Sequence, residues 1–135
     1  MEKKYQVFVS STFSDLKDER KEVIENLLNA KYIPAGMEMF TASNNEQFKY
    51  IKKIIDNCDY YVLIIGGRYG SINPITEKSY TQMEYEYAME IGIPILVFPF
   101  SNINMLSHDK RDTDLTHIEN FRKAVMSSQK LCKMW

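Results

Sequence analysis

The sequence predicts a three-layer α/β domain in which helices cover both faces of a five-stranded parallel sheet, a flavodoxin-like arrangement. Apolar segments of strand length alternate along the chain with segments of helical periodicity, as in right-handed βαβ units. Tyr60–Ile65 is a nearly continuous apolar run, which is typical of a strand buried on both faces. The 135 residues, 44% of them hydrophobic, suffice for one domain, residues 1–135, with its own core.

Five strands are expected, at residues 5–10, 32–34, 60–65, 94–98 and 131–135. The expected order is 2-1-3-4-5, which places Tyr60–Ile65 at or next to the centre of the sheet. No helix follows the fifth predicted strand. We therefore expect an uncovered apolar surface near Leu131 and Trp135, and self-association of the domain.

Capping residues mark the expected helix starts. The first helix should follow the polar run after Ser10 and extend to about Ala30, with an apolar stripe at Leu16, Val23, Ile24, Leu27 and Leu28. Ser43 with Glu46 predicts the second start, and Thr116 with Glu119 the fourth. The third helix should begin near Ser79–Thr81 and stop at Gly92.

Two charged residues fall on faces of these helices where apolar residues are expected. Glu84 lies four residues before Ala88, on the side that faces the sheet, and Arg20 interrupts the stripe of the first helix. Glu84 is either a functional carboxylate or the partner of Arg20 or Arg68 in a structural ion pair. Arg20 is either a structural cation or the group that holds a carboxylate at the upper edge of the sheet.

A ligand site is expected beyond the carboxyl ends of the first and third strands, where the strand order reverses. Backbone N–H groups after both strands suit phosphate, and an arginine adds a charge-assisted contact. The predicted nucleotide-binding residues are Ser10, Ser11, Thr12, Gly66, Gly67, Arg68, Tyr69, Gly70 and Tyr80. Helix caps, a tight turn and packing aromatic residues are the alternative interpretation.

Composition limits the other classes of function. A net charge of −1 gives no general attraction to nucleic acid, and no apolar run reaches transmembrane length. The polar start is unlike a signal peptide, and Cys58 and Cys132 lack CxxC spacing, so we expect a cytoplasmic protein with free thiols and no membrane contact. His108 and His117 have no neighbouring ligand at metal spacing, so no metal site is expected.

Four segments together resemble the family known as domain of unknown function 4062: residues 7–20, 36–40, 65–71 and 79–88. The resemblance implies a TIR-like, flavodoxin-like module at the N-terminus of a longer protein. The rest of such a protein would carry NACHT- or STAND-type ATPase and repeat regions, in an immune or signalling role.

The segment Met83–Ala88, followed by Gly92, is similar to a Met-Glu-x-Gly-x-Ala segment of nucleoside 2-deoxyribosyltransferases, whose glutamate is the nucleophile. Enzymatic TIR domains place a catalytic glutamate four residues after an aromatic residue, as Glu84 follows Tyr80. Glu86 departs from the transferase pattern, which has glycine there. These resemblances imply that Glu84 is catalytic.

Two functions follow as hypotheses. The first is an effector that cleaves an N-glycosidic bond, of the NAD glycohydrolase type, activated by homo-oligomerisation. It requires no cofactor, and NAD or a similar nucleotide is its substrate. The second is a catalytically silent TIR-like module that assembles through homotypic contacts. An open crevice at Glu84 favours the first hypothesis, and a Glu84 enclosed by its neighbours favours the second.

Overall fold

Four parallel strands form one sheet in the order β2-β1-β3-β4. The computed structural model describes residues 4–35, 44–129 and 131–135. The strands are β1 (Gln6–Ser10), β2 (Ile33–Ala35), β3 (Tyr60–Ile65) and β4 (Ile95–Pro99). This is the order of the first four strands of a flavodoxin-like sheet. β3 lies between β1 and β4, so its predicted interior position is confirmed.

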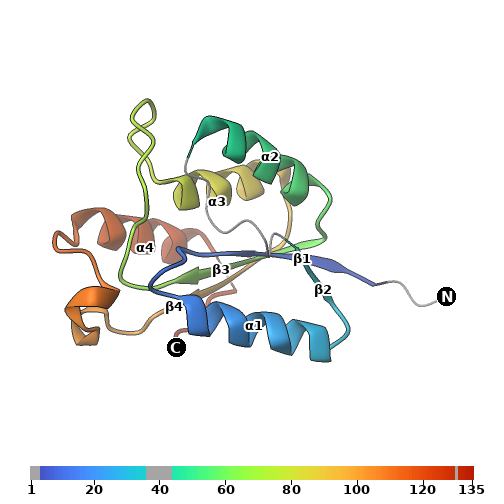
Figure 1. Cartoon of the computed structure of the whole chain (residues 1–135), viewed down its shortest axis with the longest axis horizontal. Coiled ribbons are helices and arrows are strands. Elements are labelled where there is room, and N and C mark those ends of the chain that lie inside the picture. The colour runs from blue at the N-terminus through green and yellow to red at the C-terminus, as the bar shows by residue number, and fades with distance from the viewer. Residues whose placement is uncertain (1–3, 36–43, 130) are drawn as a thin grey trace.

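Helices cover both faces of the sheet, as predicted. Figure 1 shows α1 (Lys17–Asn29) on one face, with α2 (Asn45–Asp56), α3 (Tyr80–Ile91) and α4 (Thr116–Ser128) on the other. Two short 3₁₀ helices, η1 (Ile103–Met105) and η2 (His108–Lys110), lie between β4 and α4. No helix in the described ranges combines the length and apolarity needed to span a membrane.

The predicted fifth strand is wrong. Residues 131–135 run beside β4, but they form only one isolated bridge, between Val97 and Cys132. Hydrogen bonds join Val97 N–H to Leu131 O, Lys133 N–H to Val97 O and Trp135 N–H to Pro99 O. The next bond of a parallel ladder would require an N–H at residue 99, and proline has none. Pro99 thus interrupts the ladder, and the sheet has four strands.

The helix boundaries follow most of the predicted signals. Ser79 caps α3 by accepting from the N–H of Gln82, and Gly92 ends that helix in the left-handed conformation, with φ 76°. Asn44 caps α2, while the predicted cap, Ser43, lies outside the described residues. α4 begins where predicted, at Thr116, but its N-cap is Leu115 and has no side-chain capping bond.

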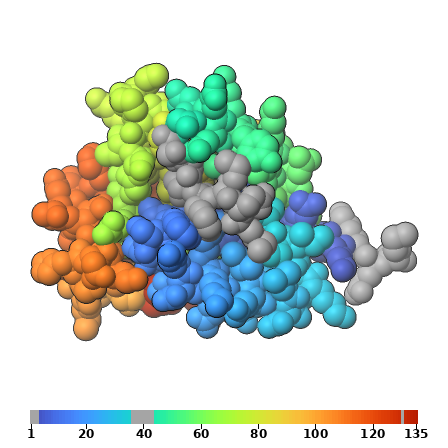
Figure 2. Space-filling model, viewed as in Figure 1, coloured from blue at the N-terminus to red at the C-terminus, as the bar shows by residue number. Residues whose placement is uncertain are grey.

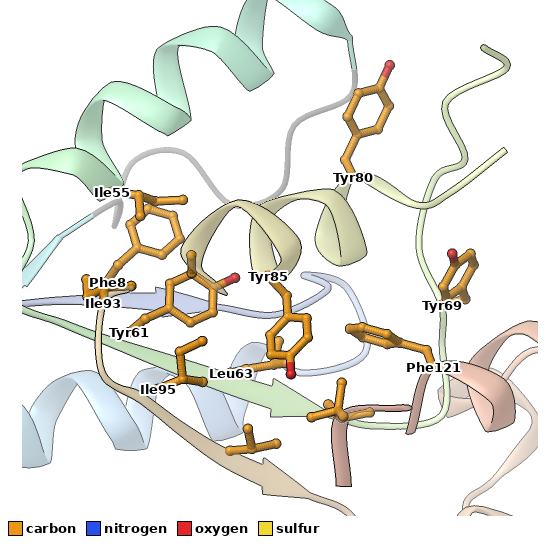
Figure 3. Close-up of a cluster of buried hydrophobic side chains, with 14 of the residues drawn as sticks. Phe8, Ile55, Tyr61, Leu63, Tyr69, Tyr80, Tyr85, Ile93, Ile95 and Phe121 are labelled. Carbon is orange, nitrogen blue, oxygen red and sulfur yellow. The ribbon is translucent and has the colours of Figure 1, made fainter. Parts of the chain in front are cut away.

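The larger core fills the space between the sheet and α2, α3 and α4. Figure 3 shows Phe8, Tyr61 and Leu63 in this layer, and the rings of Phe8 and Tyr61 stack with centroids 5.6 Å apart. The smaller core lies between the sheet and α1. Of the predicted stripe, Leu16 is buried, Val23, Ile24 and Leu27 are partly buried, and Leu28 is 53% exposed. Arg20 is the residue of α1 that is fully buried.

The left-handed conformation of Gly92 predicts the cost of adding a side chain there. A Cβ at this position meets no atom within 4 Å, so only backbone strain opposes it. We expect Gly92→Ala to lower the free energy of unfolding by about 1–2 kcal/mol in urea titrations. Gly92→Asn, which tolerates this conformation better, should cost less. Equal stability of all three proteins would contradict the assigned cap.

Candidate functional site

A buried polar cluster lies at the carboxyl end of β1, between the two helical layers. Its members are Ser10 of β1, Arg20 of α1, Tyr61 of β3 and Glu84 of α3, and each is at most 2% exposed. Ser10 Oγ donates to Glu84 Oε1 at 3.3 Å. The sequence predicted that the end of the first strand and the start of the third helix converge, and these two residues do meet.

Arg20 reaches this cluster from the opposite face of the sheet. Its Nη1 donates to Val9 O at 2.7 Å and to Ser11 Oγ at 3.4 Å. Burial lowers the pKa of the Arg20 guanidinium, and the negative charge of Glu84 acts in the opposite direction. Of the two ion-pair partners considered for Glu84, this electrostatic interaction favours Arg20.

The hydroxyl of Tyr61 remains protonated in this environment. Burial raises the pKa of Tyr61 well above its ordinary value, and the negative charge of Glu84 raises that pKa further. A phenol, a serine hydroxyl and a guanidinium are thus the polar groups gathered near the Glu84 carboxylate. All three groups can donate hydrogen bonds.

The hydroxyl groups that follow β1 are satisfied within their own turn. Ser11 Oγ donates to Thr12 O at 2.7 Å, and Thr12 Oγ1 donates to Asp15 Oδ1 at 2.6 Å. The second oxygen, Asp15 Oδ2, is buried without a hydrogen-bond partner among the described residues. Burial raises the pKa of Asp15, while the bond from Thr12 and the charges of Arg68 and Lys110 oppose this. Asp15 is a second buried carboxyl group that the sequence analysis treated only as a cap.

Gly70 brings the loop after β3 against the turn after β1. Its φ of 97° favours glycine, and a Cβ there would lie 3.1 Å from Thr12 Cγ2 and 3.4 Å from Thr81 Oγ1. Three segments far apart in the sequence therefore meet at the carboxyl ends of β1 and β3. This is the convergence that the sequence predicted.

The backbone of Gly67 lies close to residues 110 and 111 of the same chain, where the sequence analysis expected a ligand. A Cβ on Gly67 would lie 2.7 Å from Arg111 Cβ and 2.8 Å from Lys110 O, and one on Gly66 would lie 3.0 Å from Leu16 Cδ2. Lys110 Nζ also donates to Asp15 O at 3.4 Å. Figure 2 shows the orange segment that carries η1 and η2 packed against the blue start of α1. A purely local turn does not explain these glycines, because each lies under a neighbouring segment.

Asp112 accepts a hydrogen bond from the backbone N–H of Tyr69, one of the groups expected to bind phosphate. Its Oδ2 accepts from Tyr69 N–H at 2.8 Å, and its own N–H donates to Gly67 O at 2.8 Å. Sequence reasoning missed Asp112 because residues 99–114 read only as a long polar loop. No local pattern links Asp112 to a backbone group 43 positions earlier.

The three remaining predicted residues also have partners within the chain. Arg68 Nη2 donates to Asp109 O at 2.6 Å. Tyr69 is buried, stacks on His117 with centroids 5.3 Å apart, and shares a hydrogen bond with Gln82. Tyr80 is buried, and its ring centroid lies 6.4 Å from that of Phe48. Packing accounts for both tyrosines.

Glu84 does not face an open crevice. Its exposed fraction is 0%, so no part of the carboxylate is accessible in this conformation. The predicted crevice at Glu84 is therefore not open in this conformation. Among the described residues, no group of three or more His, Cys, Asp and Glu side chains is arranged to hold a metal ion.

The family model "Domain of unknown function (DUF4062)" matches residues 6–135, so the chain belongs to this family. No curated protein matches the chain. A solved structure described as 2-desoxiribosyltransferase from Leishmania mexicana is similar to it, with a TM-score of 0.45 and 15% identity over 72% of this chain. The match covers 65% of that protein. Likeness at this level carries no argument about activity.

The electrostatic interaction between the buried charges of Arg20 and Glu84 predicts energetic coupling. Because removing one member of a buried ion pair leaves the other uncompensated, Arg20→Met and Glu84→Gln should each lower the free energy of unfolding by about 3 kcal/mol. The double variant should lose less than the sum of the two, by about 1 kcal/mol or more, in urea titrations. Simple additivity would contradict direct coupling.

Asp15 predicts a pH dependence of stability. Its pKa is higher in the folded than in the unfolded state, so the folded state binds the extra proton between those two values. The contribution of Asp15 to stability is therefore complete below its unfolded pKa and is lost as pH rises through its folded pKa. We expect Asp15→Asn to remove this decline from the pH profile of unfolding, measured by urea titration. An unchanged profile would show that Asp15 does not titrate in this way.

Proposed function

We propose that this domain is a TIR-like effector module that binds a nucleotide beyond the carboxyl ends of β1 and β3 and cleaves its N-glycosidic bond with Glu84. The observation that carries the proposal is the hydrogen bond between Ser10 and Glu84, with the buried charge of Arg20 interacting electrostatically with Glu84. Burying a carboxylate and a guanidinium is costly, and such perturbed groups gather at functional sites. Their position at the reversal of strand order is where open α/β sheets bind ligands.

In the proposed reaction, the bond between the ribose C1′ and the base nitrogen breaks, and the base leaves with the bonding electrons. The Glu84 carboxylate stabilises the developing positive charge on the sugar or captures C1′ as an ester. Water then supplies the hydroxyl at C1′ and loses a proton. NAD suits this site because its nicotinamide leaves as a neutral base and needs no added proton. No cofactor is required.

Access to Glu84 requires an opening of the site, because the carboxylate is fully buried. The proposal is that homo-oligomerisation favours the open form, so the isolated domain is a resting state. We also propose that the protein is cytoplasmic and that an ATPase or repeat region lies elsewhere in a longer polypeptide. Nothing in the site calls for nucleic acid or a membrane.

A second candidate is a catalytically silent module that acts through homotypic contacts. Two observations favour it. Glu84 is enclosed beside Arg20 and Ser10, and the backbone of Gly67 is covered by residues 110 and 111. Both arrangements account for the sequence motifs without any ligand.

Glu84→Gln separates the two candidates. The parent protein, concentrated or fused to an oligomeric scaffold, is incubated with NAD and with nucleosides, and the products are separated by chromatography. If Glu84 is catalytic, the variant should turn over substrate at least about a hundredfold more slowly per folded molecule. Equal cleavage by both proteins, or no cleavage by the clustered parent, would reject the glutamate mechanism.

Two controls match this variant. Glu86→Gln alters a half-buried glutamate that pairs with Lys78 at 2.8 Å, and it should leave turnover unchanged. Gly92→Ala lowers stability at a position away from the site, so it measures how far destabilisation alone reduces activity.

A further inference from the structure

Two neighbouring hollows lie along α1 on the less covered face of the sheet. One, of about 260 Å³, is lined by Glu19, Glu22, Val23, Asn26, Ile64, Phe98 and Trp135. The other, of about 340 Å³, is lined by Val7, Leu27, Tyr32, Tyr60, Tyr61, Val62, Pro94, Ile95, Leu96 and Leu131. Asn26 and Leu27 of α1, Ile64 and Val62 of β3, and Phe98 and Leu96 of β4 line the first and second hollow respectively. They therefore form one continuous groove, here called the α1 groove.

The floor of the α1 groove is apolar and incompletely covered. It consists of same-face residues of the two strands, Val62 and Ile64 of β3 and Leu96 and Phe98 of β4. The two β4 residues are only partly buried, although parallel sheets normally have both faces covered by helices. α1 forms one wall, and residues 131–135 form the other.

Charge distinguishes the two ends of the groove. Near the start of α1 the wall carries Glu19 and Glu22, one turn apart. Glu19 Oε1 is inaccessible to solvent and has no hydrogen-bond partner among the described residues. A buried carboxylate oxygen without a partner is costly. Glu19 as a whole is half-buried and Glu22 is exposed, so their accessible parts give this end of the groove a negative charge that a cation can approach.

We propose that the α1 groove binds an amphipathic α-helix of a partner, with its apolar stripe on Ile64, Leu96 and Phe98 and a basic side chain on Glu19. The wall from Glu19 to Leu27 is roughly 12 Å long, about two helical turns. A helix parallel to α1 would extend the layer that α1 forms on this face of the described sheet. The proposal does not depend on any activity of Glu84.

A second copy of the chain offers no matching helix in its described part. The apolar stripes of α2, α3 and α4 belong to the larger core, at residues such as Ile51, Ala88 and Phe121. The side chains of α1 that are exposed are mostly charged. The groove therefore suits a different helix, whose basic edge complements the acidic wall.

Trp135 provides a direct test, because it is the single tryptophan of the chain and lines the groove. The probe is a synthetic helix of about 18 residues, since shorter peptides are marginally helical in water. It carries a leucine stripe with arginine along one edge, and a matched peptide carries glutamate there. We expect the arginine peptide to shift Trp135 emission to shorter wavelength and to bind at least tenfold more tightly than the glutamate peptide.

Single substitutions identify the surface. Glu19→Gln should weaken binding of the arginine peptide by roughly tenfold. Glu25→Gln, on the same helix but outside the groove, should not change it. Leu131→Lys, at a wall residue that is 62% exposed and therefore tolerant of change, should reduce binding.

Three results would overturn the proposal. The first is that neither peptide shifts Trp135 emission. The second is that both peptides bind equally, which would remove the assigned role of Glu19. The third is a shift of Trp135 that depends on protein concentration alone and coincides with dimerisation by light scattering, because the groove would then accept a second copy.

Discussion

The burial of Glu84 beside Ser10 and Arg20 is the interaction on which the upper edge of the sheet depends. Arg20 comes from the helix on one face and Glu84 from a helix on the other, and their opposite charges interact around the end of β1. Charged groups removed from water need compensating partners. Ser10 donates to the Glu84 carboxylate, and Val9 O and Ser11 Oγ accept from the Arg20 guanidinium. The end of β1 is consequently bonded to α3 through Ser10, and the turn after it to α1 through Ser11.

A second constraint comes from the segment between β4 and α4. Asp112 and Arg111 lie over Gly67, and Lys110 reaches the backbone of Asp15. Gly67 accommodates these residues because it has no side chain. The carboxylate of Asp112 accepts from the N–H of Tyr69, which was expected to bind phosphate. The glycine loop is therefore an internal docking surface in this conformation. Any ligand that uses the same N–H group competes with Asp112.

The two faces of the sheet differ in how completely they are buried. Three helices enclose the larger core, whereas α1 alone covers the other face, and the side chains of Leu96 and Phe98 remain partly exposed there. Residues 131–135 extend this layer without joining the sheet, since Pro99 lacks the N–H that a continuous ladder needs. The asymmetry leaves the α1 groove between α1 and Trp135.

Local patterns in the sequence determined the strands β1 to β4, the cap at Ser79 and the stop at Gly92, because apolar periodicity and capping chemistry act over a few residues. They also singled out Arg20 and Glu84, since a charge on a sheet-facing position departs from the pattern. The expected order of these strands came from the flavodoxin-like arrangement that the alternation of strands and helices implies. Tertiary structure alone decided that Glu84 is enclosed, that Asp112 lies on the glycine loop and that residues 131–135 fail to form a strand. Each of these depends on contacts between residues more than 30 positions apart, and such contacts leave no signal in any single segment.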